Sequence, residues 1–133
     1  YADRKDCMRL GIYSQTAYDQ FFPYIRPQET GTKSDIRWWE QCSKNGKGIR
    51  ITTATGRPFY ASALHYDMEQ LDEEEQKQQQ HFYNIRRSAY TNLFLDGEHA
   101  GVGGTNSWGQ LPLEKYRVRC NEKTFEFIIR PIQ

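Results

Sequence analysis

The sequence predicts an all-β protein, an antiparallel β-sandwich built from short strands. Apolar and polar residues alternate in several stretches, and turn-forming pairs such as Asn45-Gly46 and Asp96-Gly97 separate these stretches. The chain also holds nine tyrosines and seven phenylalanines, side chains that pack well on pleated sheets. At 133 residues the chain can bury one core but is short for two, so we expect residues 1–133 to form a single domain.

The first half of the chain contains the clearest hairpin signal. Asn45 and Gly46 both accept the positive φ of a type I′ turn, so they predict a tight hairpin. Residues 49–53 then alternate with the period of a half-buried strand. Thr55-Gly56 predicts a further turn, and residues 58–66 predict the returning strand.

The second half predicts one strand and a final hairpin. The apolar run 93–95 is expected to end at Asp96-Gly97. Residues 116–120 and 124–129 alternate on either side of a polar turn, which predicts a hairpin. Pro131 lacks the N–H that a central strand would need.

Two stretches could be helical, and both are expected to be peripheral. Residues 16–21 form at most two turns, and residues 68–80 contain helix formers with little apolar stripe. The second stretch lies in an acidic, glutamine-rich run, 67–80, that is expected to be solvated.

The stretch 101–109, Gly-Val-Gly-Gly-Thr-Asn-Ser-Trp-Gly, predicts a loop of specified shape, because glycines permit tight bends and close approach. Trp108 beside Asn106 and Ser107 offers a stacking face with hydrogen-bonding groups, which suits a sugar ring. A turn covering a core tryptophan is the alternative interpretation. The stretch matches neither a P-loop nor a dinucleotide-binding motif.

Several blocks of the sequence resemble the C-terminal domain of large β-galactosidases of glycoside hydrolase family 2. Residues 22–31, Phe-Pro-Tyr-Ile-Arg-Pro-Gln-Glu-Thr-Gly, and 34–39, Ser-Asp-Ile-Arg-Trp-Trp, resemble a signature of that domain. Residues 62–66 followed by Leu71-Asp72 resemble its next block, and residues 93–97 with the glycine-rich loop resemble its last. The blocks come in the family's order and cover most of the chain.

The resemblance implies a two-sheet supersandwich similar to galactose mutarotase, of which this chain would form roughly the second half. We therefore expect an excised C-terminal segment, part of the small-chain domain, domain 5, of the enzyme. A segment without its partner strands leaves open sheet edges, so it is expected to pair with another copy or to curl its sheets into a smaller sandwich.

The resemblance places both catalytic glutamates, with the magnesium and sodium sites, on a barrel domain that is missing from this chain. Retaining glycosidases need two carboxylates about 5 Å apart, and the sequence offers no convincing pair. We expect no hydrolysis by this chain alone and no cofactor of its own.

Trp108 matches the family tryptophan that reaches into the active-site mouth and stacks against the sugar. Asn106 and Ser107 are the other expected sugar-binding residues. Family members often carry an acid between the last glycine and the serine, where this chain has Thr105 and Asn106. That difference removes negative charge near the mouth.

Four further residues carry structural expectations. Arg37 is expected to form a buried salt bridge or a cation–π stack, and Glu29 to accept backbone hydrogen bonds in a turn or at a domain seam. Trp38 and Trp39 are expected to point to opposite faces of a strand, one of them into the core.

Composition excludes several classes of partner and site. With 18 basic and 17 acidic residues, bulk charge favours neither nucleic acid nor an anionic membrane, and no apolar run approaches the roughly 20 residues of a membrane span. Three cysteines and three histidines show no metal-ligand spacing, so each is expected to be structural: Cys7, Cys42, Cys120, His65, His81 and His99. The cysteines are expected to be small apolar fillers, with a disulfide between one pair as the alternative if the parent protein is exported. Residues 1–6 lack an apolar signal-peptide core, which leaves bacterial cytoplasm and periplasm both open.

The leading hypothesis is a non-catalytic domain of a β-galactosidase acting on terminal β-D-galactosides. Its expected partners are the galactoside, the enzyme's own barrel domain and a second copy. An autonomous carbohydrate-binding module and a purely structural or oligomerisation domain are the alternatives, because a strand pattern does not decide function.

Overall fold

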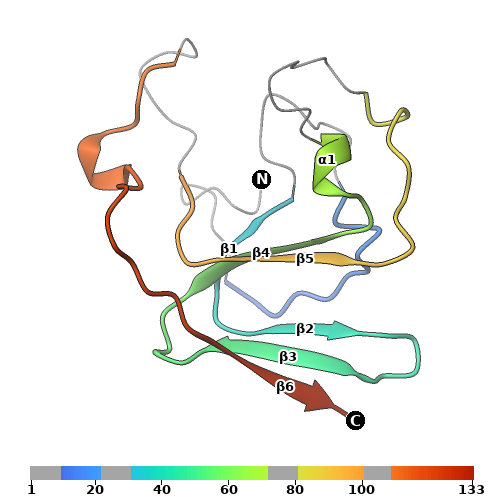
Figure 1. Cartoon of the computed structure of the whole chain (residues 1–133). Coiled ribbons are helices and arrows are strands. Elements are labelled where there is room, and N and C mark those ends of the chain that lie inside the picture. The colour runs from blue at the N-terminus through green and yellow to red at the C-terminus, as the bar shows by residue number, and fades with distance from the viewer. Residues whose placement is uncertain (1–9, 22–30, 72–80, 101–108) are drawn as a thin grey trace. The chain divides into compact units, whose positions relative to one another are not determined.

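The structure, a computed structural model, describes residues 10–21, 31–71, 81–100 and 109–133. Within these ranges six strands form two three-stranded sheets, ordered β1-β4-β5 and β2-β3-β6, with one short helix, α1 (Figure 1). The predicted all-β class is confirmed. The chain divides into two compact units, residues 1–34 with 61–95 and residues 35–60 with 96–133. The expectation of one domain over 1–133 stays a prediction.

The hairpin predicted at Asn45-Gly46 is formed by β2 (Trp39–Cys42) and β3 (Gly48–Thr53), which pair antiparallel from Trp39↔Ile51 to Cys42↔Gly48. The predicted type I′ turn is wrong, because only Gly46 has a positive φ, 83°.

A type I turn followed by a left-handed glycine replaces it, with the Gly46 N–H donating to Ser43 O at 3.0 Å and the Ser43 N–H to Lys47 O at 2.9 Å. The Asn45 carboxamide oxygen accepts from the Ser43 hydroxyl and, at 3.1 Å, from the Lys47 N–H. These two bonds hold Asn45 in a conformation that a type I′ turn does not have.

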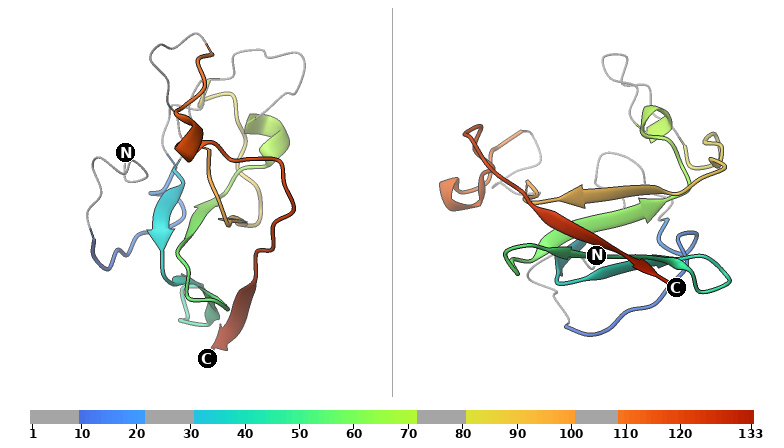
Figure 2. Two further views of the ribbon diagram at one scale, coloured as in Figure 1. Left: turned by 90° about the vertical axis from the view of Figure 1, so that its left-hand side faces the viewer. Right: turned by 60° about the horizontal axis from the view of Figure 1, so that its bottom comes forward.

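The last strand, β6 (Phe127–Ile132), pairs antiparallel with β3, from Phe127↔Thr53 to Ile132↔Gly48 (Figure 2). The predicted final hairpin is therefore wrong, since residues 116–120 form no strand. Ile129 lies directly opposite Ile51, which is 1% exposed, so β3 offers β6 a buried apolar partner that residues 116–120 lack.

Pro131 lies on an edge strand, as its missing N–H requires. The Ala54 N–H donates to Glu126 O at 3.2 Å, which continues the β3–β6 register by one pair. Hydrogen-bonded and non-hydrogen-bonded residue pairs alternate along an antiparallel ladder, so the backbone polar groups of residue 131 point away from β3. The proline therefore removes no hydrogen bond from the ladder.

The other sheet consists of β1 (Lys33–Ile36), β4 (Phe59–Leu64) and β5 (Asn92–Asp96), with β4 in the middle. Figure 2 shows β4 and β5 running in opposite directions. The predicted strand over 58–66 exists, but it joins this sheet instead of returning along β3. The predicted turn before it is present, with Gly56 at φ 71°, and β5 ends at Asp96 as expected.

Each unit has its own small core. Among the described residues, the largest fully buried side chains are Phe59 and Ile51, both in the second unit. The described part of the first unit buries five apolar residues: Ala17, Ala61, Ala63, Leu64 and Tyr66. In the first unit the Ala63 N–H also donates to the side-chain oxygen of the buried Gln20 at 3.4 Å. Small residues in β4 let neighbouring chain segments approach closely.

The two helical candidates differ in outcome. Residues 16–21 form turns without a helix, with the Asp19 N–H donating to Thr16 O at 3.1 Å and the Thr16 hydroxyl to the Asp19 carboxylate at 2.5 Å. In the second stretch α1 spans Met68–Leu71, and residues 72–80 lie outside the described ranges. None of the helices described here has the length and apolar character of a membrane span.

The expectation that one of the two tryptophans lies in the core is wrong, because Trp39 is only half-buried in β2 and Trp38, directly before that strand, is 37% exposed. The expected role of Arg37 is wrong, because its side chain is exposed and a different arginine stacks on Trp38. The guanidinium of Arg50 lies 4.8 Å from the Trp38 ring centroid and pairs with Glu40 at 3.0 Å. Arg50 belongs to β3 and Trp38 directly precedes β2, so the stack joins residues 12 positions apart, which sequence adjacency could not indicate.

The two cysteines in the described ranges, Cys42 and Cys120, are exposed free thiols. Their predicted role as apolar fillers is wrong, since both lie on surfaces. Cys7 and Glu29 lie outside the described residues.

Candidate functional site

The predicted sugar-binding residues Trp108, Asn106 and Ser107 lie outside the described residues, as do the other members of 101–108. The structure instead describes the chain on both sides of the glycine-rich loop. Residues 97–99, called here the loop stem, precede it, and residues 109–119, called here the exit segment, follow it. Both belong to the second unit.

Each residue of the loop stem approaches another residue of the second unit. A Cβ placed on Gly97 would lie 2.9 Å from the ring carbon Cγ of Phe125, so only glycine fits against that ring without movement. The Glu98 carboxylate pairs with the ammonium of Lys123. The His99 ring stacks on Tyr60 of β4, with centroids 5.6 Å apart. The chain just before the loop thus contacts two parts of the second unit, residues 123–125 and Tyr60.

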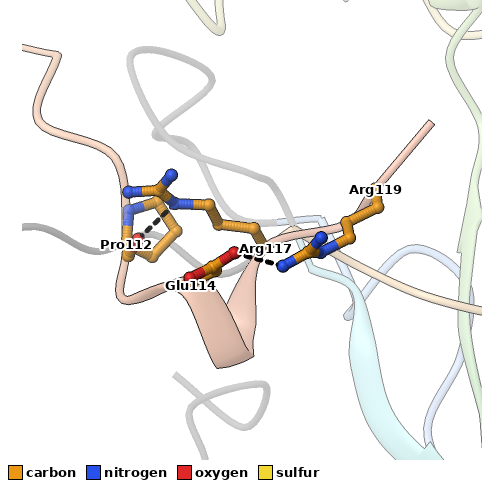
Figure 3. A network of polar contacts seen from close by, with 4 residues as sticks. All are labelled: Pro112, Glu114, Arg117 and Arg119. Atoms are coloured by element: carbon orange, nitrogen blue, oxygen red, sulfur yellow. Dashed lines mark hydrogen bonds and ion pairs between the residues drawn. The ribbon is translucent and has the colours of Figure 1, made fainter.

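The exit segment is organised by contacts within itself (Figure 3). The Arg117 Nε–H donates to Pro112 O at 2.7 Å, and the Arg119 guanidinium pairs with the Glu114 carboxylate. A 3₁₀ turn at Glu114–Tyr116 lies between them, with the Tyr116 N–H donating to Leu113 O at 2.8 Å. This segment carries a shallow hollow lined by one acid and three cations, Glu114, Lys115, Arg117 and Arg119.

A polar cluster that the sequence did not indicate is centred on Asp67, just before α1. Its Oδ1 accepts from the Ser88 hydroxyl at 2.7 Å, the Tyr90 hydroxyl at 2.8 Å and the Asn92 amide at 3.4 Å. Its Oδ2 accepts from the Gln70 amide at 3.4 Å. Within the run 67–80, expected to be a solvated linker or a short surface helix, this half-exposed residue has both carboxylate oxygens engaged.

These hydrogen bonds change the acidity of two groups. Hydrogen bonds from Ser88 and then from Tyr90 stabilise the carboxylate and lower the pKa of Asp67 below 3.8. The same Asp67 hydrogen bond, followed by the Asp67 charge, raises the pKa of Tyr90 above 10.0. Asp67 is therefore held as an anion that accepts hydrogen bonds.

Backbone contacts extend the Asp67 cluster along the chain. The Gln70 side chain accepts from the Arg86 N–H at 2.6 Å and donates to Arg86 O at 2.9 Å, and the Ser88 N–H donates to His65 O at 2.7 Å. Residues 86–92 are thus fixed to the corner between β4 and α1. Because β5 begins at Asn92, the cluster also sets where that strand starts.

The three histidines are engaged by neighbours. His65 Nδ1 lies 3.3 Å from the Thr91 hydroxyl, His81 stacks on Tyr83 at 5.1 Å, and His99 stacks on Tyr60. In the ranges that the structure describes, no group of three histidine, cysteine or acidic side chains is arranged to hold a metal ion.

The sequence match spans nearly the whole chain. A family model described as β-galactosidase small chain matches residues 1–129. The chain belongs to the β-galactosidase small-chain family. It is 35% identical to β-galactosidase BgaC of Bifidobacterium adolescentis over 92% of this chain and 11% of that protein. The β-galactosidase of Lactobacillus delbrueckii subsp. bulgaricus is 36% identical over 83% of this chain and 10% of that protein. The β-galactosidase of Priestia megaterium is 31% identical over 99% of this chain and 12% of that protein.

This small-chain segment thus spans about a tenth of the length of the curated relatives that it matches. Sequence reasoning found the family, but missed the residues that contact the loop stem, Tyr60, Lys123 and Phe125. One signal was available for Asp67, since an aspartate directly before a helix often occupies the N-cap. Its donors Ser88, Tyr90 and Asn92 are more than 20 positions away, and no local pattern connects them.

Proposed function

We propose that this chain is the non-catalytic C-terminal segment of a β-galactosidase that hydrolyses terminal β-D-galactosides, and that Trp108 lines the active site. The family match over residues 1–129 carries the proposal, because it extends through the glycine-rich loop. The anchored loop stem supports it, since a loop that positions a substrate needs a fixed base.

Trp108 would act by positioning the sugar. An indole offers a flat apolar face for the apolar side of a pyranose, and Asn106 and Ser107 supply hydrogen-bonding groups for its hydroxyls. Holding the glycosidic oxygen near an acid catalyst lowers the entropic part of the barrier. Thr105 and Asn106 add no charge, so aglycones are selected by shape and hydrogen bonding.

The catalytic glutamates and the magnesium and sodium sites are proposed to lie on the enzyme's barrel domain. Several acids of this chain are already engaged, which agrees with a non-catalytic role: Glu40 with Arg50, Glu98 with Lys123, Glu114 with Arg119, and Asp67 with its four donors. A general acid needs a carboxyl group directed at the substrate.

A hybrid enzyme tests the proposal, with this chain replacing the matching segment of BgaC from Bifidobacterium adolescentis. Trp108→Ala is expected to lower kcat/KM for lactose about 10- to 100-fold, the usual effect of lost positioning. Trp38→Ala is the matched control, because Trp38 is an exposed tryptophan outside the glycine-rich loop, directly before β2, and it should retain wild-type activity. An unchanged kcat/KM in Trp108→Ala contradicts the role of Trp108.

The isolated chain gives the second test. Lactose is expected to produce no saturable change in its tryptophan fluorescence, because the sugar site requires the barrel. Saturable binding at millimolar lactose, lost in Trp108→Phe, would instead establish an autonomous carbohydrate-binding module.

The chain is also proposed to support assembly with a second copy. Its edge strand β6 exposes three consecutive apolar side chains, Phe127, Ile128 and Ile129, at 45%, 37% and 53%. Exposed edge strands with apolar side chains favour pairing with another strand.

A further inference from the structure

We propose that the β2-β3-β6 sheet carries a binding site for a tetrahedral oxyanion, a phosphate or sulfate group, between the guanidinium groups of Arg50 and Arg130. Both arginines belong to the second unit. The site is independent of the proposed function, because neither Trp108 nor the barrel takes part in it.

The register of the sheet sets the two arginines side by side. Arg50 of β3 is the direct partner of Arg130 on β6, and on its other side it is the direct partner of Glu40 on β2 (Figure 1). Directly opposite residues of an antiparallel pair share one face of the sheet, with Cα atoms about 4.5–5.5 Å apart. Glu40, Arg50 and Arg130 therefore form a row across three strands, and all three are exposed.

This row has one carboxylate for two guanidinium groups. Arg50 pairs with Glu40 at 3.0 Å, whereas in the described part of the chain no side chain pairs with Arg130. The register continues to Ala54 and Glu126, which places Glu126 on the same face, but it pairs with neither arginine. Like charges directly opposite each other destabilise a sheet, so an anion bound between the two arginines would offset that cost.

The guanidinium group of Arg50 is held in one orientation. Its Nη1 donates to the Glu40 carboxylate, and its Cζ lies 4.8 Å from the centroid of the Trp38 ring. Stacking uses the flat face of a guanidinium group, so the N–H groups at its edge that Glu40 leaves free can donate to an anion. A group that is oriented before binding loses less conformational entropy when the ligand binds.

The two guanidinium groups specify the shape of the anion. Each presents a planar fork of N–H donors that can bind two acceptor oxygens at once. A carboxylate has two oxygens and fills one fork, whereas a phosphate or sulfate group has enough oxygens to accept from both. Thr52, two residues from Arg50 in β3, lies on the same face and adds a hydroxyl donor. The site is therefore expected to prefer a tetrahedral oxyanion.

Isothermal titration calorimetry of the whole chain with inorganic phosphate tests the site, at low ionic strength because salt screens exposed charges. The wild type is expected to saturate at millimolar phosphate. Arg130→Gln is expected to raise the Kd at least about 10-fold, because it removes one of the two charged donors. Arg57→Gln, which removes the same charge from an exposed arginine in the turn after β3, is the matched control and should leave the Kd unchanged.

Glu40→Gln should change the affinity in the opposite direction. It frees Nη1 of Arg50 and removes the carboxylate that competes with the anion, so the Kd for phosphate is expected to fall about 3-fold. A poorly folded variant would not bind phosphate more tightly, so this gain separates a role in binding from a role in folding. A Kd that does not fall in Glu40→Gln excludes Arg50 from binding and overturns the site.

Two further outcomes overturn the site. One is a wild-type chain that phosphate does not saturate. The other is an equal rise of the Kd in Arg130→Gln and Arg57→Gln, which would show attraction to bulk charge. Acetate, the carboxylate probe, is expected to bind at least about 10-fold more weakly than phosphate. Equal Kd values for acetate and phosphate overturn the preference for a tetrahedral anion.

Glucose 6-phosphate distinguishes the two sources of the phosphate group. A Kd at least about 10-fold below that of inorganic phosphate would assign the site to a phosphate carried on a larger molecule. Equal Kd values would assign it to the free ion. In both cases Arg130→Gln should weaken the binding of glucose 6-phosphate and of inorganic phosphate alike, and an unchanged Kd for either ligand would overturn the site for that ligand.

Discussion

The imidazole of His99 stacks on the ring of Tyr60, with centroids 5.6 Å apart and planes inclined by 28°. Tyr60 follows the fully buried Phe59 in β4, so its backbone is fixed by the core of the second unit. His99 is the second residue before the glycine-rich loop. The stack therefore connects the core to the start of the loop that carries Trp108.

Removing the stack should impair positioning more than stability. His99→Ala in the hybrid enzyme is expected to lower kcat/KM for lactose about 10-fold, because small displacements of positioning groups reduce rates strongly. His99→Phe retains an aromatic ring and is expected to stay within about 2-fold of wild type. Equal losses in both variants would show that the imidazole acts by hydrogen bonding and not by stacking.

Gly97→Ala should destabilise the chain by steric overlap. The added Cβ would lie 2.9 Å from Cγ and 3.2 Å from Cβ of Phe125, and such overpacking costs about 1–3 kcal/mol. Urea unfolding of the chain measures the loss. In the Phe125→Ala variant the overlapping ring is absent, so adding Gly97→Ala should lower the free energy of unfolding by less than it does in the wild type. An equal loss in both backgrounds would contradict the overlap.

Asp67 should make stability depend on acid pH. Its hydrogen bonds from Ser88 and Tyr90 lower its pKa in the folded state below the ordinary 3.8. The stabilisation is therefore fully present above pH 3.8 and is lost as pH falls through the folded pKa. Urea unfolding between pH 2 and 7 should show this loss in the wild type and a weaker one in Asp67→Asn.

Tyr90→Phe provides the companion variant for the acid transition. It removes one donor to the Asp67 carboxylate, so the pKa of Asp67 in the folded state should rise towards 3.8. The difference between the folded and unfolded pKa values of Asp67 should therefore become smaller. The loss of stability of Tyr90→Phe at low pH should lie between the losses of the wild type and of Asp67→Asn. An acid transition that is identical in all three proteins would exclude Asp67 as its source.

Self-association through β6 should respond to the outward edge of that strand. Ile129→Lys places a charge on a 53% exposed position and is expected to reduce dimer formation in sedimentation equilibrium. Pro131→Val supplies an N–H that points away from β3, so this variant is expected to increase dimer formation. A chain that stays monomeric in wild type and Pro131→Val alike would contradict assembly through this edge.

Local sequence predicted many of the elements in the described residues because turns and alternation are short-range properties. Gly46 and Gly56 have the positive φ that their turn sequences indicate, and β3 and β5 follow the alternating and apolar stretches expected of them. The turn type at Asn45 was mispredicted, because the side-chain bonds of Asn45 to Ser43 and Lys47 select a different loop.

The family and its glycine-rich motif could also be found from sequence, since several motifs in a fixed order can be recognised from the residues alone. The family model over residues 1–129 bears out that resemblance. The roles of Trp108, Asn106 and Ser107 stay predictions, because they depend on where the loop lies against a barrel outside this chain.

The sequence by itself determined the all-β class, the positions of most strands and the family, because these follow from local pattern and motif order. Only the tertiary structure decided that β6 pairs with β3, that β4 joins the other sheet, and that Asp67 collects donors from 86–92. Strand partners and polar clusters are selected by burial and hydrogen bonding between residues far apart in the chain. The same long-range selection placed Tyr60 beneath His99, where no spacing in the sequence connects them.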